Sequence, residues 1–191
     1  MDNWIIVGLG NPGSQYEHTR HNVGFWMLDQ FAEQAGLSFK TDNRFQGELV
    51  QQIMPQAKFW LLKPLTFMNR SGQSVAALAN FYKIPPERIV VLHDELDLPT
   101  GTVRLKKSGG HGGHNGLRDI IAQLGGQKDF LRCRIGIGHP GNSRQVSDYV
   151  LSRPSPDDRQ QIMHGIDAAI QALPDVFNNQ LDKAMNWLHS L

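Results

Sequence analysis

Apolar residues along this chain form short continuous runs that are separated by stretches with helical spacing. Runs of this length bounded by turn-forming residues are typical of buried β-strands. Six such runs lie at 4–7, 47–54, 58–62, 89–93, 102–105 and 131–137. Between them, apolar residues recur every three or four positions, as on the buried face of a helix. These stripes comprise Val23, Met27, Phe31 and Ala35; Val75, Leu78, Ala79 and Tyr82; and Leu117, Ile120, Ile121 and Leu124.

Helix-ending residues follow each of the three stripes. Gly36 comes after the first, Pro85 and Pro86 after the second, and Gly125 and Gly126 after the third. Glycine is common just past a helix, and proline cannot continue one. Strands that alternate with helices predict an α/β fold. We expect a twisted mixed β-sheet with helices on both faces.

The chain past residue 150 has helical spacing throughout. Ser155 and Pro156, followed by two aspartates, are typical of a helix N-terminus with a serine cap and proline in the first turn. Met163, Ile166, Ala169, Ile170 and Leu173 then form a stripe, and Val176, Leu181, Ala184 and Leu188 mark a final amphipathic segment. With no internal repeat and no long linker, we expect a C-terminal helical segment packed within one domain that spans residues 1–191.

The first predicted strand ends in the glycine-rich run 8–13, which has the spacing of a dinucleotide-binding fingerprint. That fingerprint requires a helix to start at once, and an acidic residue about 20 positions further on. Here Pro12 fixes a turn, helical spacing begins only near Asn22, and no acidic residue ends a second strand in that region. The run therefore predicts a rigid loop that presents Asn11, with His21 shortly after it.

Charge is distributed unevenly along the chain. Residues 101–144 hold eight Lys or Arg against two Asp, a local charge of +6, whereas the other 147 residues carry −5. The same segment contains the glycine-rich run 109–116. Basic side chains beside a flexible glycine loop suit a phosphate backbone, although a solvated charged face has the same composition.

Cysteine usage and hydropathy indicate the compartment. The single cysteine, Cys133, excludes an internal disulfide, and residues 1–4 lack the pattern of a secretory signal. No apolar run approaches the ~20 residues that span a bilayer. We expect from these features a soluble cytoplasmic protein without a membrane partner. As a separate expectation, we take the protein to be a monomer.

Several polar residues follow predicted strands. Asn11 follows the first, Asn69 the third and Asp94 the fourth, while His21 and Asn115 begin helices. Reactive groups in open α/β sheets gather beyond the carboxyl ends of the strands. One histidine, one aspartate and three asparagines are therefore expected around one pocket.

These residue types suit the hydrolysis of an activated carbonyl such as an ester. Asp94 can hold one imidazole nitrogen of His21 and leave the other free to deprotonate water, while amides donate to a developing oxyanion. The chain shows no glycine-flanked nucleophilic serine, and Cys133 lies within a strand, where burial is usual. The alternatives are structural: His21 as a helix cap, Asp94 as a loop residue, or His111 and His114 as part of a metal site without further ligands at a standard spacing.

Six tracts, in order, resemble the bacterial peptidyl-tRNA hydrolase family. They are 7–13 (VGLGNPG), 19–22 (TRHN), 66–72 (TFMNRSG), 93–99 (HDELDLP), 109–119 (GGHGGHNGLRD) and 134–141 (RIGIGHPG). Six tracts in family order are far more specific than any one of them. The resemblance implies an esterase that frees tRNA from peptides in peptidyl-tRNA, and it implies no metal and no cofactor.

The resemblance also implies roles for individual residues. His21 corresponds to the general base, Asp94 to the carboxylate that orients it, and Asn11 to the amide that positions base and ester. Five residues correspond to contacts with the peptide and the tRNA 3′ end: Tyr16, Met68, Asn69, His114 and Asn115. Lys106 and Arg134 correspond to a basic pair that grips the tRNA 5′ phosphate, and both lie in the +6 segment.

Two rival functions follow from the same residues. A non-catalytic tRNA- or RNA-binding relative with the same fold would have lost the base, and the presence of both His21 and Asp94 disfavours it. A nicotinamide oxidoreductase is disfavoured by the late helix after the glycine run.

Overall fold

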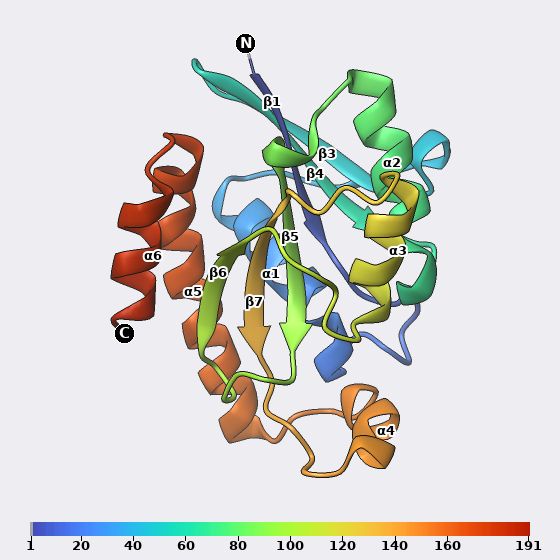
Figure 1. Cartoon of the computed structure of the whole chain (residues 1–191), viewed down its shortest axis with the longest axis vertical. Helices are drawn as coiled ribbons and strands as arrows, with labels where there is room; N and C mark the ends of the chain where they lie inside the picture. The colour runs from blue at the N-terminus through green and yellow to red at the C-terminus, as the bar shows by residue number, and fades with distance from the viewer. Residues whose placement is uncertain (1) are drawn as a thin grey trace.

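Seven strands form one mixed sheet in the computed structural model, which describes residues 2–191 (Figure 1). The strands are β1 (Asp2–Gly8), β2 (Lys40–Asp42), β3 (Gly47–Ile53), β4 (Ala57–Pro64), β5 (Ile89–Glu95), β6 (Val103–Lys107) and β7 (Leu131–Gly136). Their spatial order is β2-β3-β4-β1-β5-β7-β6. The central strands β4, β1, β5 and β7 run parallel, whereas β2, β3 and β6 pair antiparallel at the two edges. The predicted mixed sheet is confirmed.

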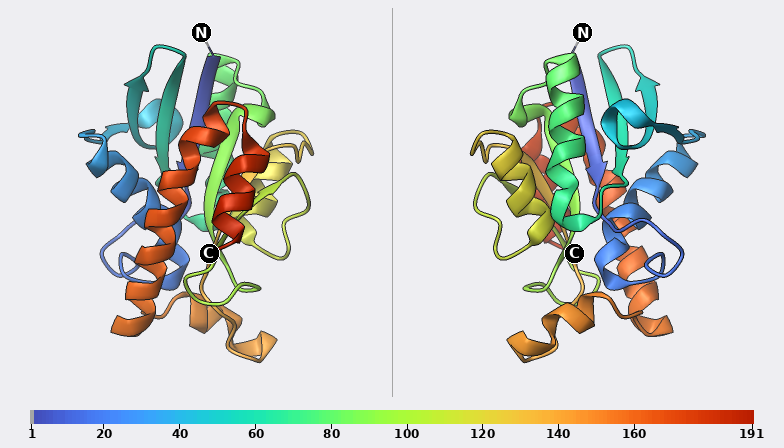
Figure 2. Two further views of the ribbon diagram at one scale, coloured as in Figure 1. Left: turned by 90° about the vertical axis from the view of Figure 1, so that its left-hand side faces the viewer. Right: turned by 90° about the vertical axis from the view of Figure 1, so that its right-hand side faces the viewer.

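Six α-helices accompany the sheet in the described chain: α1 (Val23–Gln34), α2 (Ser71–Tyr82), α3 (Asn115–Gln123), α4 (Val146–Val150), α5 (Pro156–Phe177) and α6 (Leu181–His189). Two apolar clusters lie on opposite faces of the sheet. One joins the sheet to α1, α5 and α6, and the other joins it to α2 and α3. The two side views in Figure 2 show these two layers of helices in turn. Helices on both faces were predicted and are confirmed.

One short strand and one short α-helix were not predicted from the sequence. β2 has three residues, Lys-Thr-Asp, which are largely exposed at the sheet edge and carry no apolar signal. α4 has five residues and ends at residue 150, the position past which we expected helical structure to begin. It projects from one end of the molecule (Figures 1 and 2).

The C-terminal segment is helical as predicted, with one change of boundary. The Ser155 hydroxyl accepts from the Asp158 backbone N–H at 3.1 Å, which caps α5 at the predicted serine. Val176, predicted within the final segment, instead belongs to the last turn of α5, because that helix continues through Pro174 to Phe177. No helix among the described residues is long and apolar enough to cross a membrane.

α1 packs against the sheet at an unusually short distance near its first turn. A Cβ atom at Gly24 would overlap the Leu92 carbonyl oxygen and lie 2.6 Å from Leu9 N. Gly8 on β1 faces Gly24 from the other side, and a Cβ there would overlap the Gly24 carbonyl. Only glycine at both positions permits this approach, which places the turn before α1 directly over the ends of β1 and β5.

We expect Gly24→Ala to lower the free energy of unfolding by about 2 kcal/mol, because the added methyl meets backbone atoms that cannot rotate away. Urea denaturation followed by circular dichroism measures the change. Gly110→Ala is the matched control, since a Cβ at Gly110 meets nothing within 4 Å. Equal stability of the two variants would contradict a backbone contact at Gly24.

Candidate active site

Polar side chains gather in one cavity beyond the carboxyl ends of β1 and β5. The cavity has a volume of about 850 Å³, which falls in the usual range for ligand sites. Eight residues expected at the site line it: Asn11, Tyr16, His21, Met68, Asn69, Asp94, His114 and Asn115. The cavity therefore brings together residues that are more than 100 positions apart in sequence, five of them expected from the strand-end rule and Tyr16, Met68 and His114 from the family resemblance.

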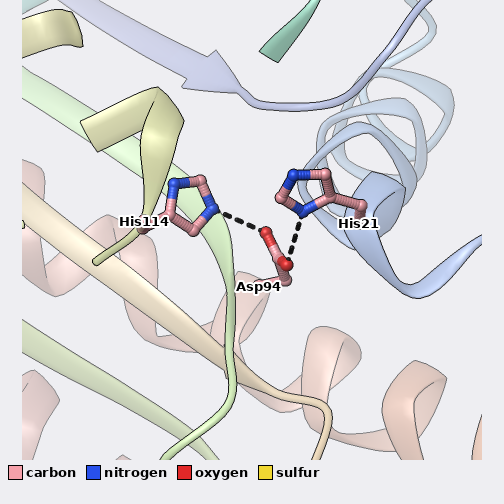
Figure 3. A group of neighbouring side chains, drawn as sticks. All are labelled: His21, Asp94 and His114. Carbon is pink, nitrogen blue, oxygen red and sulfur yellow. Dashed lines mark hydrogen bonds and ion pairs between the residues drawn. The ribbon is translucent and has the colours of Figure 1, made fainter. Parts of the chain in front are cut away.

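A single carboxylate joins two histidines in this cavity (Figure 3). Asp94 Oδ2 lies 2.7 Å from His21 Nδ1, and Asp94 Oδ1 lies 2.7 Å from His114 Nε2. Asp94 comes from the end of β5, His21 from the 3-10 turn η1 (Arg20–Asn22), and His114 from the residue before α3. The pairing of His21 with Asp94 agrees with the expectation from sequence, whereas the second histidine on the same carboxylate was not anticipated.

Burial and pairing act in opposite directions on these groups. Burial alone would raise the pKa of Asp94, whose side chain is 3% exposed, but the charges and hydrogen bonds of His21 and His114 hold that pKa far below its usual range. Burial alone would lower the pKa of His21, but Asp94 more than offsets it and raises the pKa above its ordinary value. The site thus combines an ionised carboxylate with a strengthened imidazole base.

Asn11 is locked by a second asparagine that sequence reasoning did not select. The Asn11 backbone N–H donates to Asn22 Oδ1, and Asn22 Nδ2 donates back to the Asn11 carbonyl, both at 2.9 Å. The Met68 N–H donates to Asn11 Oδ1 at 2.7 Å. Because Oδ1 is occupied in this way, the Asn11 side chain presents its N–H groups. Asn22 directly follows His21 in the TRHN tract, and that position was the available signal.

Phe67 is a further residue at the rim that was not singled out. Its φ of 63° and ψ of 155° lie where residues other than glycine are strained. The side chain is about half exposed and packs edge-on against Tyr16, with 6.3 Å between ring centroids. This conformation turns the chain so that Met68 and Asn69 reach the cavity.

Lys106 lies on the edge strand β6 and Arg134 on the neighbouring strand β7, and neither side chain lines the cavity. Arg134 on β7 pairs with Arg104 on β6, and Lys106 lies two residues further along, so the three side chains share one face of the sheet. Arg134 Nε donates to Glu95 Oε1 at 2.9 Å, and Glu95 does line the cavity. Burial alone would raise the pKa of Glu95, but the hydrogen bond from Arg134 more than offsets burial and lowers that pKa below its ordinary value.

Other candidate chemistry is limited. Cys133 is fully buried, and burial raises its pKa to about 12, so it offers no thiolate. His111 Nδ1 accepts from the Gly113 backbone within its own loop. His21, Asp94 and His114 place three potential metal-ligand atoms within 4.8 Å of one another. One nitrogen of each histidine, His21 Nδ1 and His114 Nε2, however, already forms a hydrogen bond with the Asp94 carboxylate.

Comparisons with known proteins point to one family. The sequence pattern of the family described as Peptidyl-tRNA hydrolase matches residues 5–191. The chain is 53% identical to a peptidyl-tRNA hydrolase of Neisseria gonorrhoeae over 97% of its own length and 96% of the relative's. It is 54% identical to that of Dichelobacter nodosus over 98% of both.

A solved structure is similar over nearly the whole fold. The crystal structure of peptidyl-tRNA hydrolase from Acinetobacter baumannii superimposes with a TM-score of 0.93 and 45% sequence identity, covering 97% of this chain and 93% of that one. Sequence and structure agree over almost the full length, and on these grounds the chain belongs to the peptidyl-tRNA hydrolase family.

Proposed function

We propose that this protein hydrolyses the ester bond between peptide and tRNA in peptidyl-tRNA, with His21 as the general base. The observation that carries the proposal is the 2.7 Å contact between His21 Nδ1 and the buried Asp94 carboxylate. The other ring nitrogen of His21 points away from Asp94 (Figure 3). It has no hydrogen-bond partner among residues 2–191, so it is available to a water molecule.

The hydrogen bonds distinguish the two histidines on Asp94. His114 Nδ1 accepts from the backbone N–H groups of Gly116 and Leu117, at 3.1 and 3.3 Å. A nitrogen that accepts in this way carries no hydrogen, so His114 Nε2 is the donor to Asp94. Both nitrogens of His114 are therefore engaged, and only His21 has one free to take a proton.

The proposed reaction is a general-base hydrolysis. His21 Nε2 takes a proton from water as the oxygen adds to the ester carbonyl, and Asp94 stabilises the imidazolium that forms. The N–H groups of the Asn11 amide donate to the oxyanion or hold the ester beside the base. The tetrahedral intermediate then expels the ribose oxygen, which receives the proton from His21. The products are a free peptide acid and deacylated tRNA, and no step requires a metal or a cofactor.

Two further asparagines suit the recognition of a peptide and the tRNA 3′ end. Arg118 donates to Asn115 Oδ1 at 3.2 Å, which directs the Asn115 amide N–H groups to other partners. As the family motif implies, we assign Asn69 and Asn115 to contacts with the peptide backbone of the substrate and the tRNA 3′ end. The wall of the cavity is assigned to Tyr16, Met68 and His114. Side-chain amides that hydrogen-bond a peptide group favour peptidyl-tRNA, whose α-amine is blocked, over aminoacyl-tRNA, whose α-amine is a charged ammonium. The unblocked substrate would leave these amides without hydrogen-bond partners.

The basic face beside the cavity suits the phosphates of tRNA. Lys106 is exposed, and Arg134 uses only Nε in its contact with Glu95, so its terminal N–H groups have no partner among residues 2–191. Both lie in the +6 segment, whose charge attracts a polyanion. We assign the tRNA 5′ phosphate to this pair.

We further propose that the chain acts as one domain and as a monomer. Both apolar clusters share a single sheet, which supports one domain over residues 1–191. One chain supplies all eight expected site residues to the cavity, so the site is complete in a monomer. Because its substrate belongs to translation, we place the activity in the cytoplasm.

The direct test is release of deacylated tRNA from N-acetyl-aminoacyl-tRNA, with unblocked aminoacyl-tRNA as the control substrate. We expect the blocked substrate to be cleaved strongly in preference to the unblocked one.

His21→Ala should slow single-turnover cleavage by at least about 10²-fold while tRNA binding persists, because a general base acts in the transition state. Extended EDTA treatment should leave the wild-type rate unchanged. A loss restored by zinc, or a His21→Ala variant with more than about a tenth of the rate, would contradict this mechanism.

For the basic face, Lys106→Ala and Arg134→Ala should weaken tRNA binding, and each should reduce the log–log salt slope by up to about one unit, the value for one phosphate ion pair. Filter binding at several salt concentrations measures both quantities. Lys107→Ala is the matched control, because Lys107 neighbours Lys106 on β6 but points to the opposite face of the sheet. Equal reductions in activity on tRNA and on a short ester without the 5′ phosphate would instead assign both residues to the catalytic cavity.

A further inference from the structure

His114 connects the N-terminus of α3 to the catalytic carboxylate. We propose that His114 is a positioning residue: as the N-cap of α3 it is held in one tautomer, and through Nε2 it fixes the Asp94 carboxylate for His21. This role goes beyond a contact with substrate in the cavity wall. The inference rests on the proposed function of His21 as the base.

The capping geometry is complete. His114 has φ −76° and ψ 119°, the extended conformation of an N-cap residue, and α3 begins at the next residue. Its Nδ1 accepts from the second and third N–H groups of the helix, where serine or aspartate oxygens ordinarily bind. Histidine at this position therefore replaces a common cap and adds a second hydrogen-bonding atom on the far side of the ring.

That second atom reaches the catalytic carboxylate. Because Nδ1 carries no hydrogen, Nε2–H is the donor to Asp94 Oδ1 at 2.7 Å. With Oδ1 held from this side, Oδ2 is directed to His21 Nδ1 at the same distance. The partial positive charge of the helix N-terminus polarises the ring in the direction that strengthens this donor. A hydrogen-bonded series thus runs from α3 through His114 and Asp94 to His21.

Packing around the ring leaves little room for another orientation. His93 lies edge-on to His114, with 5.1 Å between ring centroids. A Cβ at Gly116 would lie 2.7 Å from Met68 Sδ and 3.0 Å from His114 Cε1, so a larger residue where α3 approaches the ring would have to displace these side chains. The ring is therefore flanked by His93 of β5, by His21 of η1 at 5.4 Å between ring centroids, and by the first turn of its own helix.

The charges around Asp94 come from several elements. His21 faces it from η1, and His93 lies beside it on β5, where burial and the neighbouring His114 lower the pKa of His93 to about 4. Glu95 lies next along β5 and is paired with Arg134 of β7. Four further titratable groups line the same cavity: Tyr16, Asp97, His111 and His139. Among residues 2–191, only His21 and His114 hydrogen-bond the Asp94 side chain.

Loss of the His114 donor should change the pKa of His21 in a predictable direction. Asp94 shares its negative charge between two imidazole donors, so losing one leaves more of that charge for His21. The pKa of His21 should then rise further, and the acidic limb of the pH–rate profile should move to higher pH. Asparagine is an excellent N-cap but is too short to replace the imidazole Nε2, so it separates capping from positioning.

We expect His114→Asn to retain the wild-type Tm, to lower kcat by about 10-fold and to move the acidic limb upward by roughly half to one pH unit. His114→Ala should show the same kinetic change and also lower Tm by roughly 3 °C, because it removes the cap as well. His164→Asn, on the exposed face of α5, is the matched control and should change neither property.

Wild-type kinetics in His114→Asn would reduce His114 to a helix cap and overturn the proposal. A raised KM with unchanged kcat and an unchanged limb would make it a substrate contact only, with the same consequence. ¹⁵N NMR of the histidine rings supplies a readout that does not depend on activity. It should show hydrogen on His114 Nε2 and none on Nδ1, and the opposite tautomer would overturn the proposal. If wild-type protein failed to cleave N-acetyl-aminoacyl-tRNA, the proposed function would fail while the NMR result still tested the tautomer.

Discussion

The buried carboxylate of Asp94 is the constraint on which the site depends. A charge with 3% exposure is costly unless it is paired, and two imidazoles at 2.7 Å supply the pairing. Their elements, η1 and the start of α3, lie far apart in sequence and meet only because β5 runs between β1 and β7 and ends between them. The sheet order and the close approach of α1 at Gly24 are therefore requirements of the chemistry as well as of the fold.

The same region shows how polar groups can be fixed by one another. Asn22 holds the backbone of Asn11 from both sides, and the Met68 N–H occupies the Asn11 side-chain oxygen. His114 is held by two backbone donors and by Asp94. Each group is directed by contacts that exist before substrate arrives. Preorganised donors and acceptors of this kind reduce the reorganisation needed in the transition state.

Sequence predicted the features that depend on local pattern. The apolar strands, the helical stripes and the Ser155 cap are encoded within a few residues each, and the strand-end rule gathered Asn11, His21 and Asp94. β2 escaped because three exposed polar residues pair only through tertiary structure. The interlock of Asn22 and the dual bonding of His114 depend on the direction of side chains across the cavity, which spacing along the chain does not specify. Roles for Lys106 and Arg134 came from family resemblance, and their place beside the cavity required the β6–β7 register.

The central claim is that Asp94 makes His21 an effective base, and the pH dependence of single-turnover hydrolysis by Asp94→Asn tests it most directly. Asparagine keeps the shape but removes the charge that raises the pKa of His21. We expect a slower rate and an acidic limb displaced to lower pH, with thermal stability close to wild type. A wild-type hydrolysis rate with an unchanged acidic limb, or a loss of activity explained wholly by unfolding of the variant, would contradict the claim.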